Sequence, residues 1–448
     1  MNINQYTYYY FIGVGGIGMS ALARYFNQMG KSVMGYDKIS TSLTSLLEEE
    51  GIDIHYEDNI DKISTTINKD NTLIIYTPAI PKKHQELNHF INKGFQVIKR
   101  SDALGAITRE TTCMAVAGTH GKTTTSSLLG HILKVAKLPS TAFLGGIVEN
   151  YNSNIILGGN EISVVEADEF DRSFLKLDPE YVCITSMDAD HLDIYGDASN
   201  IEKSFLEFAS MAKKKLFAKA GLNIPNALTY HVEEKADYYA DNIQLKEAYF
   251  TFDLHHPLGV IHEIPMHLPG RHNIENAVAA IAMAMELGVK ENQIKEALDT
   301  FKGIKRRFSR FQTASGKIII DDYAHHPTEL NAIIRATQNF YPNKSITAVF
   351  QPHLYSRTRD FADDFAKSLA VLEDLILLEI YPAREEPIQG INADFLADKI
   401  EDIHGVRPLV KNLNNVLDEI EKHSSDIILL MGAGNIDTLY EPLKNKIQ

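Results

Sequence analysis

The sequence predicts an α/β protein composed of three domains. At 448 residues the chain is too long for one compact core. Short apolar runs that resemble strands alternate with helical patterns along almost its whole length, which favours parallel sheets covered by helices. Glycine-rich turns follow two of these runs, as expected where a sheet binds a ligand. We place the domains at residues 1–109, 110–303 and 304–448.

Composition and charge limit the classes of function. The chain carries 44 basic and 59 acidic residues, a net charge of −15, which argues against a broad nucleic-acid surface but not against small anionic ligands. No apolar run approaches the ~20 residues of a membrane span, and the N-terminus lacks the pattern of a signal peptide. Cys113 and Cys183 lie in apolar runs and are expected to be buried and reduced. We therefore expect a cytoplasmic protein with no nucleic-acid or membrane partner.

The first block opens with the strand "YYYFIG" and the motif Gly13-x-Gly15-x-x-Gly18, which leads into a helix. The next strand, "SVMGYD", ends at Asp37. This arrangement is the fingerprint of a dinucleotide-binding, Rossmann-like fold, and NAD is the obvious ligand. The motif selects only a pyrophosphate at a helix N-terminus, however, and a UDP-sugar carries the same group. Both ligands remain open at this point.

The second block begins with "AVAGTHGKTTTSS", residues 115–127, which follows a strand and precedes a helix. It resembles the phosphate-binding P-loop G-x-x-x-x-G-K-[ST], but Val116 occupies the position of the first glycine. Gly121, Lys122 and Thr123 complete the second half. Backbone N–H groups and Lys122 would hold phosphates, and the Thr123 hydroxyl would hold Mg²⁺. The alternative is an ordinary strand-to-helix turn with a solvated lysine.

Two acidic segments follow later strands of this block. "SVVEADEFD" places Glu166, Asp168 and Glu169 at one strand end, and "SMDADHLDIYG" places Asp188 and His191 at the end of the next strand. Parallel sheets bind ligands at this edge, where carboxylates can complete the shell of a Mg²⁺ ion. The second segment suits another divalent ion. A solvated acidic loop is the alternative for each segment.

Further polar motifs follow. "LPGRHNIENA" places His272 and Asn273 before a helix with one apolar face, and Asn273 is either a ligand contact or the helix N-cap. His255 and His256 fall in a segment that we interpret as a polar loop. In the third block "IIIDDYAHHPTE" ends a strand, and Pro327 suits the first position of the next helix. The two outer blocks are typical of dinucleotide folds around a central nucleoside-triphosphate domain.

Eight motifs carry a resemblance to a known family. In order from residue 11 to residue 388 they are "FIGVGGIGMSALA", "AGTHGKTTTSSLL", "VEADEFDRSFL", "DADHLDIYG", "PGRHNIENA", "DDYAHHPTE", "FQPHLYSRT" and "IYPAREEPI". Over essentially its whole length the chain resembles the Mur ligases, and within them those that act on UDP-N-acetylmuramate and L-alanine. The family also uses a shortened P-loop without the first glycine. The resemblance implies a Rossmann-like N-terminal domain, a central P-loop ATPase-like domain with a mostly parallel sheet, and a Rossmann-like C-terminal domain.

The resemblance implies an ATP-dependent amide ligase of peptidoglycan precursor synthesis. ATP would convert the muramoyl carboxylate of UDP-N-acetylmuramate into an acyl phosphate, which the amine of L-alanine would attack. Mg²⁺ would be the metal, with Mn²⁺ able to substitute. The protein would be a monomer or a homodimer.

The resemblance also implies residue roles. Catalysis would depend on Lys122, Glu166 and His191. The metal ligands would be Thr123, Glu166 and His191. ATP would be bound by Gly118, Thr119, His120, Gly121, Lys122, Thr123, Thr124, His272, Asn273, Arg307 and Asp322. The UDP-sugar would be bound by Gly15, Gly16, Ile17, Gly18, Met19, Ser20 and Asp37. L-Alanine would be bound by Tyr323, His326 and Arg357.

Two positions depart from the family pattern, and three other functions stay open as alternatives. Leu354 stands where the family usually carries arginine, which removes one cation near the substrates. Leu206 lies near the position of a carbamylated lysine in other Mur ligases, so no carbamate is expected. The alternatives are a recycling ligase that joins a murein tripeptide to UDP-N-acetylmuramate, an NAD-dependent oxidoreductase and a non-catalytic UDP-sugar sensor.

Overall fold

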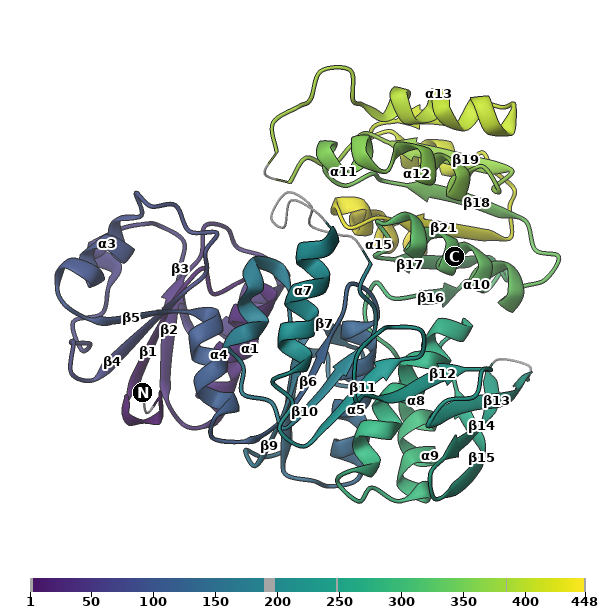
Figure 1. Cartoon of the computed structure of the whole chain (residues 1–448). Coiled ribbons are helices and arrows are strands. Elements are labelled where there is room, and N and C mark those ends of the chain that lie inside the picture. Colours follow the sequence, from purple (N-terminus) through teal and green to yellow (C-terminus); the bar gives the residue numbers. More distant parts are fainter. Residues whose placement is uncertain (1–2, 189–197, 247–248, 384, 447–448) are drawn as a thin grey trace. The chain divides into compact units, whose positions relative to one another are not determined.

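The structure is a computed structural model that describes residues 3–188, 198–246, 249–383 and 385–446. The chain forms two compact units: residues up to His267 with Asn273–Lys302, and Leu268–His272 with the residues from Gly303 onward. Figure 1 shows three sheets, each within one predicted domain range, although the boundaries themselves stay a prediction. Within the described ranges, no helix combines the length and apolar character that crossing a bilayer requires.

The first sheet has five parallel strands in the order β3-β2-β1-β4-β5. Tyr9 and Phe11 of the central strand β1 pack with α1 and α4, whereas Tyr10 and Ile12 pack with α3 on the other face. The strands are β1 Tyr8–Ile12, β2 Ser32–Tyr36, β3 Asp53–His55, β4 Thr72–Tyr76 and β5 Gln96–Lys99. The helices are α1 Ile17–Gln28, α2 Ser42–Glu49, α3 Gln85–Asn92 and α4 Arg100–Thr108, with short 3₁₀ turns at Ile3–Gln5 and Ile60–Lys62.

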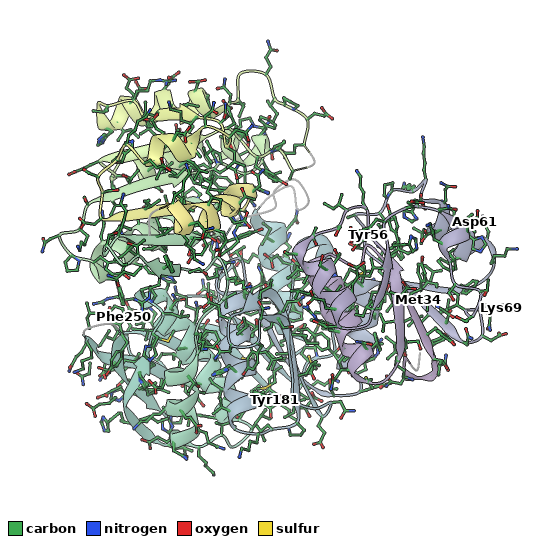
Figure 2. The ribbon with its side chains drawn as sticks, turned by 180° about the vertical axis from the view of Figure 1, so that it is seen from behind. Met34, Tyr56, Asp61, Lys69, Tyr181 and Phe250 are labelled. Carbon is green, nitrogen blue, oxygen red and sulfur yellow. The ribbon has the colours of Figure 1, made fainter. Side chains whose placement is uncertain are left out.

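The central sheet has ten strands in the order β15-β14-β13-β12-β11-β10-β6-β9-β7-β8. The run from β13 to β7 is parallel, and antiparallel strands border it on both sides. The strands are β6 Thr112–Ala117, β7 Ser140–Val148, β8 Ser153–Leu157, β9 Ile162–Glu166, β10 Tyr181–Ile184, β11 Lys215–Lys219, β12 Leu228–Val232, β13 Tyr238–Leu245, β14 Phe250–His256 and β15 Gly259–Met266. The helices are α5 Lys122–Val135, η3 Phe170–Lys176, α7 Ala198–Ala209, α8 Arg271–Met285 and α9 Glu291–Thr300. In Figure 2, Met34 marks β2, and Tyr181 and Phe250 mark β10 and β14.

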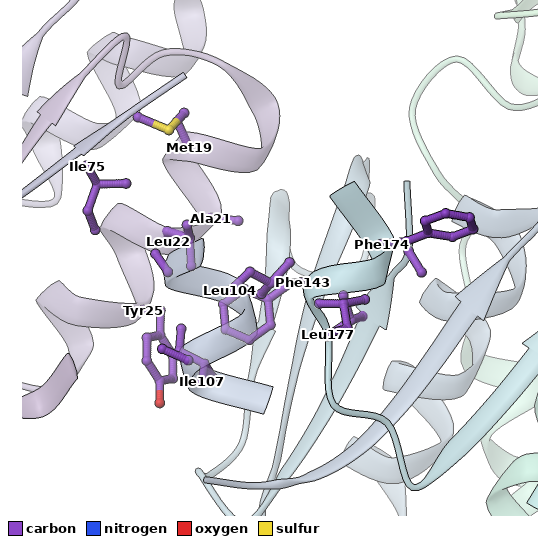
Figure 3. Packing of buried hydrophobic residues seen from close by; sticks show 14 of the residues in the cluster. Met19, Ala21, Leu22, Tyr25, Ile75, Leu104, Ile107, Phe143, Phe174 and Leu177 are labelled. Carbon is purple, nitrogen blue, oxygen red and sulfur yellow. The ribbon is translucent and has the colours of Figure 1, made fainter. Parts of the chain in front are cut away.

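One hydrophobic core is continuous between the first and central sheets. The ring of Tyr25 on α1 lies 5.3 Å, centroid to centroid, from that of Phe143 on β7. Leu104 of α4 and Phe174 of η3 belong to the same buried cluster, part of which Figure 3 shows. The blocks that we predicted separately therefore fold as one compact unit, because their apolar faces share a core.

The second unit contains a six-stranded sheet in the order β16-β17-β21-β18-β19-β20, parallel except for β16. Helices α10, α12 and α13 cover one face, and α14, α15 and the η4 turn cover the other. The strands are β16 Ser309–Gln312, β17 Ile318–Asp322, β18 Ile346–Phe350, β19 Asp374–Leu378, β20 Leu409–Lys411 and β21 Ile427–Met431. The helices are α10 Pro327–Phe340, α11 Tyr355–Asp360, α12 Ala362–Leu369, α13 Ala393–His404, α14 Val416–Ile420, η4 Asn435–Leu439 and α15 Tyr440–Lys446.

The polar hairpins of the central sheet differ from the sequence prediction. His255 and His256 end strand β14 and do not lie in a loop, so that interpretation was wrong. This strand was missed because its polar and apolar residues alternate and no continuous apolar run marks it. The predicted apolar face of α8 is buried, but burial extends round the whole helix from Ala277 to Ala284, because alanines there let neighbouring elements approach closely.

A buried polar network ties the start of α1 to the central sheet. Asn154 of β8 is fully buried; its side-chain N–H donates to the Ile17 carbonyl and, at 2.9 Å, to the Ser20 hydroxyl. Its oxygen accepts from Nη1 of Arg24 at 2.6 Å. The buried Arg24 guanidinium also donates to both carboxylate oxygens of Glu50, at 2.8 and 2.9 Å. The network therefore fixes the glycine-rich turn against β8.

We predict that Asn154→Ala lowers the free energy of unfolding by about 1–3 kcal/mol, because it leaves a buried guanidinium N–H of Arg24 without its acceptor. Urea unfolding followed by circular dichroism would measure the effect. Asn223→Ala is the matched control, since Asn223 is exposed in the same unit. Equal midpoints for the two variants would contradict the prediction.

Candidate active site

The phosphate loop joins β6 to α5. Val116 is a fully buried residue of β6, so the loop itself begins at Gly118. Gly118 and Gly121 have φ values of +138° and +83°, which L side chains rarely adopt. A Cβ atom on Gly118 would collide with the Thr185 hydroxyl, and one on Gly121 would lie 2.6 Å from Oδ1 of Asn276. The loop is therefore tight and requires both glycines.

The segment after β10 supports the phosphate loop. Ser186 Oγ accepts from the backbone N–H of His120 at 2.7 Å and lies 2.9 Å from Thr119 Oγ1. The backbone N–H of Asp188 donates to Thr119 Oγ1 at 2.9 Å, and the Asp188 carboxylate lies 3.3 Å from Nε2 of His120. The predicted metal ligand His191 lies outside the described residues, so its role stays a prediction.

Lys122 begins α5, and its ammonium group is held among oxygen atoms. Nζ donates to the Gly118 carbonyl at 2.5 Å and lies 2.8 Å from each carboxylate oxygen of Glu169, which is 3% exposed. Burial acts to lower the pKa of Lys122, but Glu169 and the other carboxylates of its segment raise it above the usual value. Lys122 is therefore a permanent positive charge at the centre of the phosphate loop.

Glu166 ends β9 and faces the same loop. Its Oε1 accepts from the Thr123 hydroxyl at 2.9 Å, and its Oε2 accepts from the backbone N–H of Gly145 at 2.7 Å. Burial raises the pKa of Glu166, although Lys122 and these hydrogen bonds oppose that shift. A carboxylate and a hydroxyl in contact are oxygen donors of the kind that Mg²⁺ prefers, so Thr123 and Glu166 fit the predicted metal. In the described part of the chain, no group of three or more His, Cys, Asp or Glu side chains is placed so that it could hold a metal ion.

The glycine-rich turn follows β1. Oδ2 of Asp37 accepts from the backbone N–H of Gly15 at 2.7 Å, so Asp37 holds the turn directly. Gly13 has a φ of +87°, which glycine adopts without strain. The Ser20 hydroxyl is fully buried and donates to the Ile17 carbonyl at 2.9 Å. The Ser20 hydroxyl thus supports the turn from inside, and the predicted contact of Ser20 with the sugar nucleotide stays a prediction.

A cavity of about 260 Å³ extends from the glycine-rich turn to Glu166. The predicted residues Gly16, Ile17, Gly18 and Met19 line one end of it. The cavity therefore joins two sites that lie more than a hundred positions apart in the sequence, and both belong to the first unit.

Several wall residues of this cavity were missed in the sequence. Arg100 follows β5, while Phe143 and Gly145 belong to β7. The available signal for Arg100 was its position at the carboxyl end of a strand in a doubly-wound sheet. Thr77 offered the same signal after β4.

Asn273 was assigned two alternative roles, and one is wrong. Helix α8 begins at Arg271, so Asn273 lies inside its first turn and is not the N-cap. Asn273 is 8% exposed. One turn later, Oδ1 of Asn276 accepts from the Thr125 hydroxyl at 3.3 Å and lies against Gly121. Asn276 was missed in the sequence, although its position three residues after Asn273 places both asparagines on one face of the helix.

Six predicted residues belong to the second unit: His272, Arg307, Asp322, Tyr323, His326 and Arg357. The two oxygens of Asp322 accept from the backbone N–H groups of Phe308 and Ala324, at 2.8 and 2.9 Å. Burial raises the pKa of Asp322 to about 6. The guanidinium carbon of Arg307 lies 5.4 Å from the centre of the Tyr323 ring, within cation–π range. The structure thus brings Arg307 and Tyr323 together beside the strand that ends in Asp322.

The structure also describes the surroundings of His326, Arg357 and Leu354, whose functional roles stay predictions. His326 caps α10 by accepting from the backbone N–H of Thr328 at 3.4 Å, and Pro327 occupies the first helical turn, as predicted. Arg357 is 8% exposed within α11. Leu354, which replaces the family arginine, precedes α11 with a φ of +70°, a strained conformation for leucine.

Three protein-family models match consecutive parts of the chain. They are "Mur ligase family, catalytic domain" over residues 8–112, "Mur ligase middle domain" over 116–284 and "Mur ligase, glutamate ligase domain" over 306–434. The chain belongs to the Mur ligase family. This confirms the predicted family, and the three-domain α/β fold is likewise confirmed.

Individual Mur ligases resemble the chain over its full length. The UDP-N-acetylmuramate–L-alanine ligases of Flavobacterium psychrophilum and Christiangramia forsetii are 52% and 50% identical to it over 450 residues, covering 100% of this chain and 99% of each relative. The solved UDP-N-acetylmuramate-alanine ligase MurC of Thermotoga maritima has a TM-score of 0.83 at 27% identity, covering 98% of this chain and 99% of that one. A murein peptide ligase from Psychrobacter arcticus has a TM-score of 0.69 at 21% identity, covering 98% of each chain, which shows the shared fold.

We predict that Glu169→Gln lowers the free energy of unfolding of this Mur ligase by roughly 1–3 kcal/mol, because the buried ammonium group of Lys122 loses its partner. The loss stays moderate because Glu166 and Asp168 still lie near Lys122. Chemical unfolding midpoints would measure the loss. Glu161→Gln is the control, since Glu161 is an exposed carboxylate of the same unit. An unchanged midpoint in Glu169→Gln would mean that the ion pair contributes no net stability.

Proposed function

We propose that this Mur ligase joins L-alanine to the muramoyl carboxylate of UDP-N-acetylmuramate in peptidoglycan precursor synthesis, converting ATP to ADP and phosphate. Its full-length relatives at 50% identity and above carry this activity in their names. The structural observation that supports the proposal is the meeting of Lys122, Thr123 and Glu166 at a phosphate loop, beside a cavity that reaches the glycine-rich turn. The phosphate loop suits a triphosphate, and the glycine-rich turn suits the diphosphate of a sugar nucleotide.

The first step is phosphoryl transfer. A carboxylate oxygen of the muramoyl group forms a bond to the γ-phosphorus of ATP while the bond to the β–γ bridging oxygen breaks, and ADP leaves with that electron pair. Lys122 supports this step by neutralising charge on the transferring group, since phosphoryl transfer depends mainly on positioning and electrostatics. To reach the phosphate, Lys122 exchanges the Glu169 carboxylate for phosphate oxygens.

The second step forms the amide. The amine nitrogen of L-alanine attacks the acyl carbon to give a tetrahedral intermediate, the nitrogen loses a proton, and the C–O bond to phosphate breaks as phosphate leaves. We propose Tyr323, His326 and Arg357 for the amino acid, with Arg suited to its carboxylate. We propose His272, Asn273, Arg307 and Asp322 for the nucleotide. The reacting atoms must come within ~3–3.5 Å of one another before either step proceeds.

Thr123 and Glu166 would hold Mg²⁺, and we propose His191 for a second ion. The metal, when bound, would neutralise negative charge on the phosphates and the muramoyl carboxylate. Mn²⁺ should substitute because it accepts the same oxygen ligands. We further propose that the enzyme acts in the cytoplasm, as a monomer or a homodimer.

The test of this function is ATP hydrolysis in the presence of each substrate alone and both together. We expect rapid phosphate release only when UDP-N-acetylmuramate and L-alanine are both present, with a matching amount of amide product. Phosphate release with a murein tripeptide in place of L-alanine would favour the recycling ligase. Micromolar binding of NADH would favour the oxidoreductase, and UDP-sugar binding without any turnover would favour the sensor.

We predict that Lys122→Met lowers kcat by at least roughly 10²–10³-fold, the usual effect of losing one group that stabilises transition-state charge. Affinity for UDP-N-acetylmuramate should stay unchanged, because the glycine-rich turn is a separate part of the unit. Steady-state kinetics and calorimetry would measure the two quantities. Lys134→Met, an exposed lysine at the other end of α5, is the control, and an equal loss of sugar-nucleotide affinity in Lys122→Met would show that the sites are not separate.

We predict that His191→Ala lowers kcat more than it weakens ATP binding, because a second ion would offset the repulsion between two anions that peaks in the transition state. The measurements are kcat against Mg²⁺ and Mn²⁺ concentration and the melting temperature. A variant with unchanged metal dependence and a sharply lower melting temperature would make His191 a structural residue, and the second metal site would be withdrawn.

A further inference from the structure

The cavity between the glycine-rich turn and Glu166 has a single cationic wall residue among those that the structure describes. Arg100 begins α4, directly after β5, so it stands at the carboxyl edge of the first sheet. Its side chain is 27% exposed, and the nearest acidic group is Asp168, with 3.7 Å between Nη2 and Oδ2. At that distance the two groups attract but do not form a hydrogen bond. Arg100 is therefore held in place while its donors remain available to a ligand.

The Arg100 side chain lies across the glycine-rich turn. A Cβ atom on Gly18 would lie 2.5 Å from Nη1 and 3.1 Å from Cδ of Arg100, so the absence of a side chain at Gly18 makes room for the guanidinium. At Gly16, by contrast, the nearest described atom to such a Cβ would be 3.6 Å away. The third glycine of the motif therefore serves the approach of Arg100 as well as the turn.

The turn itself offers unused donors beside this cation. The N–H groups of Met19 and Ser20 bond to the Gly16 carbonyl, and that of Gly15 bonds to Asp37. The N–H groups of Ile17 and Gly18 have no acceptor in the described part of the chain. Two free N–H groups at the start of a twelve-residue helix, with a guanidinium alongside, form a site for a phosphate.

The order of residues along the cavity decides which phosphate Arg100 meets. From the glycine-rich turn toward Glu166, Gly18 comes first, followed by Arg100, whose partner Asp168 lies two positions from Glu166 in the same wall. A sugar nucleotide whose carboxylate reaches Glu166 must run from nucleoside to sugar in the same direction. The phosphate attached to the sugar is therefore the one nearest to Arg100.

We infer that Arg100 binds the sugar-side phosphate of UDP-N-acetylmuramate, and that Asp168 positions the guanidinium until the substrate replaces it. This inference rests on the proposed function and adds to it a residue that distinguishes a diphosphate from a monophosphate. Because the contact is made on binding and persists through the reaction, its loss raises KM for the sugar nucleotide and leaves kcat nearly unchanged.

The test compares the binding of UDP-N-acetylmuramate, UDP and UMP by calorimetry. In Arg100→Met we expect affinity for UDP-N-acetylmuramate and for UDP to fall roughly 10- to 100-fold, the range for charge-assisted hydrogen bonds, and affinity for UMP to change less than about threefold. Arg100→Lys keeps the charge without the bidentate geometry and should lose less than Arg100→Met. Arg109→Met, an exposed arginine at the other end of α4, is the control and should match the wild type.

The outcomes separate the two proposals. If the wild-type chain binds UDP-N-acetylmuramate and Arg100→Met binds UDP with unchanged affinity, this inference is overturned and the proposed function is not. An equal loss for UMP and UDP also overturns it, since Arg100 would then shape the turn and not contact the sugar-side phosphate. If Arg100→Met fails to fold, an unaltered KM for the sugar nucleotide in Arg100→Lys overturns the inference in its place. Failure of the wild-type chain to bind UDP-N-acetylmuramate would overturn the proposed function and this inference together.

Discussion

The ammonium group of Lys122 is the charge on which the rest of the site depends. The segment "EADE" places Glu166, Asp168 and Glu169 within four positions beside the phosphate loop, and three carboxylates so close would repel one another and any phosphate. Lys122 lies 2.8 Å from both oxygens of Glu169 and retains its proton despite its burial. The same charge that stabilises the acidic segment is thus available to a phosphate, because an anion that displaces Glu169 meets an ammonium group already in place.

Strand order explains why these groups meet. β6 pairs with β9 on one side and with β10 on the other, so the phosphate loop lies between the segments that follow both strands. The core shared by α1, α4 and β7, with the Asn154 network, then fixes the glycine-rich turn relative to that loop. A rigid frame of this kind keeps the phosphate loop and the glycine-rich turn at a fixed separation, which is the condition under which positioning contributes most to a rate. The second unit has a separate sheet, in which Asp322 ends β17 and Tyr323 follows directly.

The predictable part of the site is the part that local sequence determines. Lys122 and Thr123 were singled out because a strand, a turn and a helix succeed one another within a few residues, and Glu166 because it ends a later strand. The hydrogen bond between Thr123 and Glu166 is compatible with the metal role, which stays a prediction. Arg100 was missed because its contact with Gly18 joins positions 82 apart (100 − 18) and appears only once α4 packs beside α1. The Ser20 hydroxyl is buried against Asn154 of β8, a strand that the sequence pattern did not reveal. Burial and tertiary neighbours, which a motif does not contain, decided each of these outcomes.

The missing first glycine of the phosphate loop follows from the same neighbours. In the longer pattern that glycine begins the turn, but here Val116 is still part of β6, paired with Glu166 on one side and Cys183 on the other. Here Gly118 is the residue whose backbone closely approaches a neighbouring segment, namely Thr185 and Ser186 at the end of β10. Hydroxyl groups there accept from the His120 N–H and contact Thr119, so the short loop gains its rigidity from an adjacent strand end and not from a longer turn of its own. Val116 can therefore contribute to the core, since the loop reaches its phosphate-binding shape with two glycines.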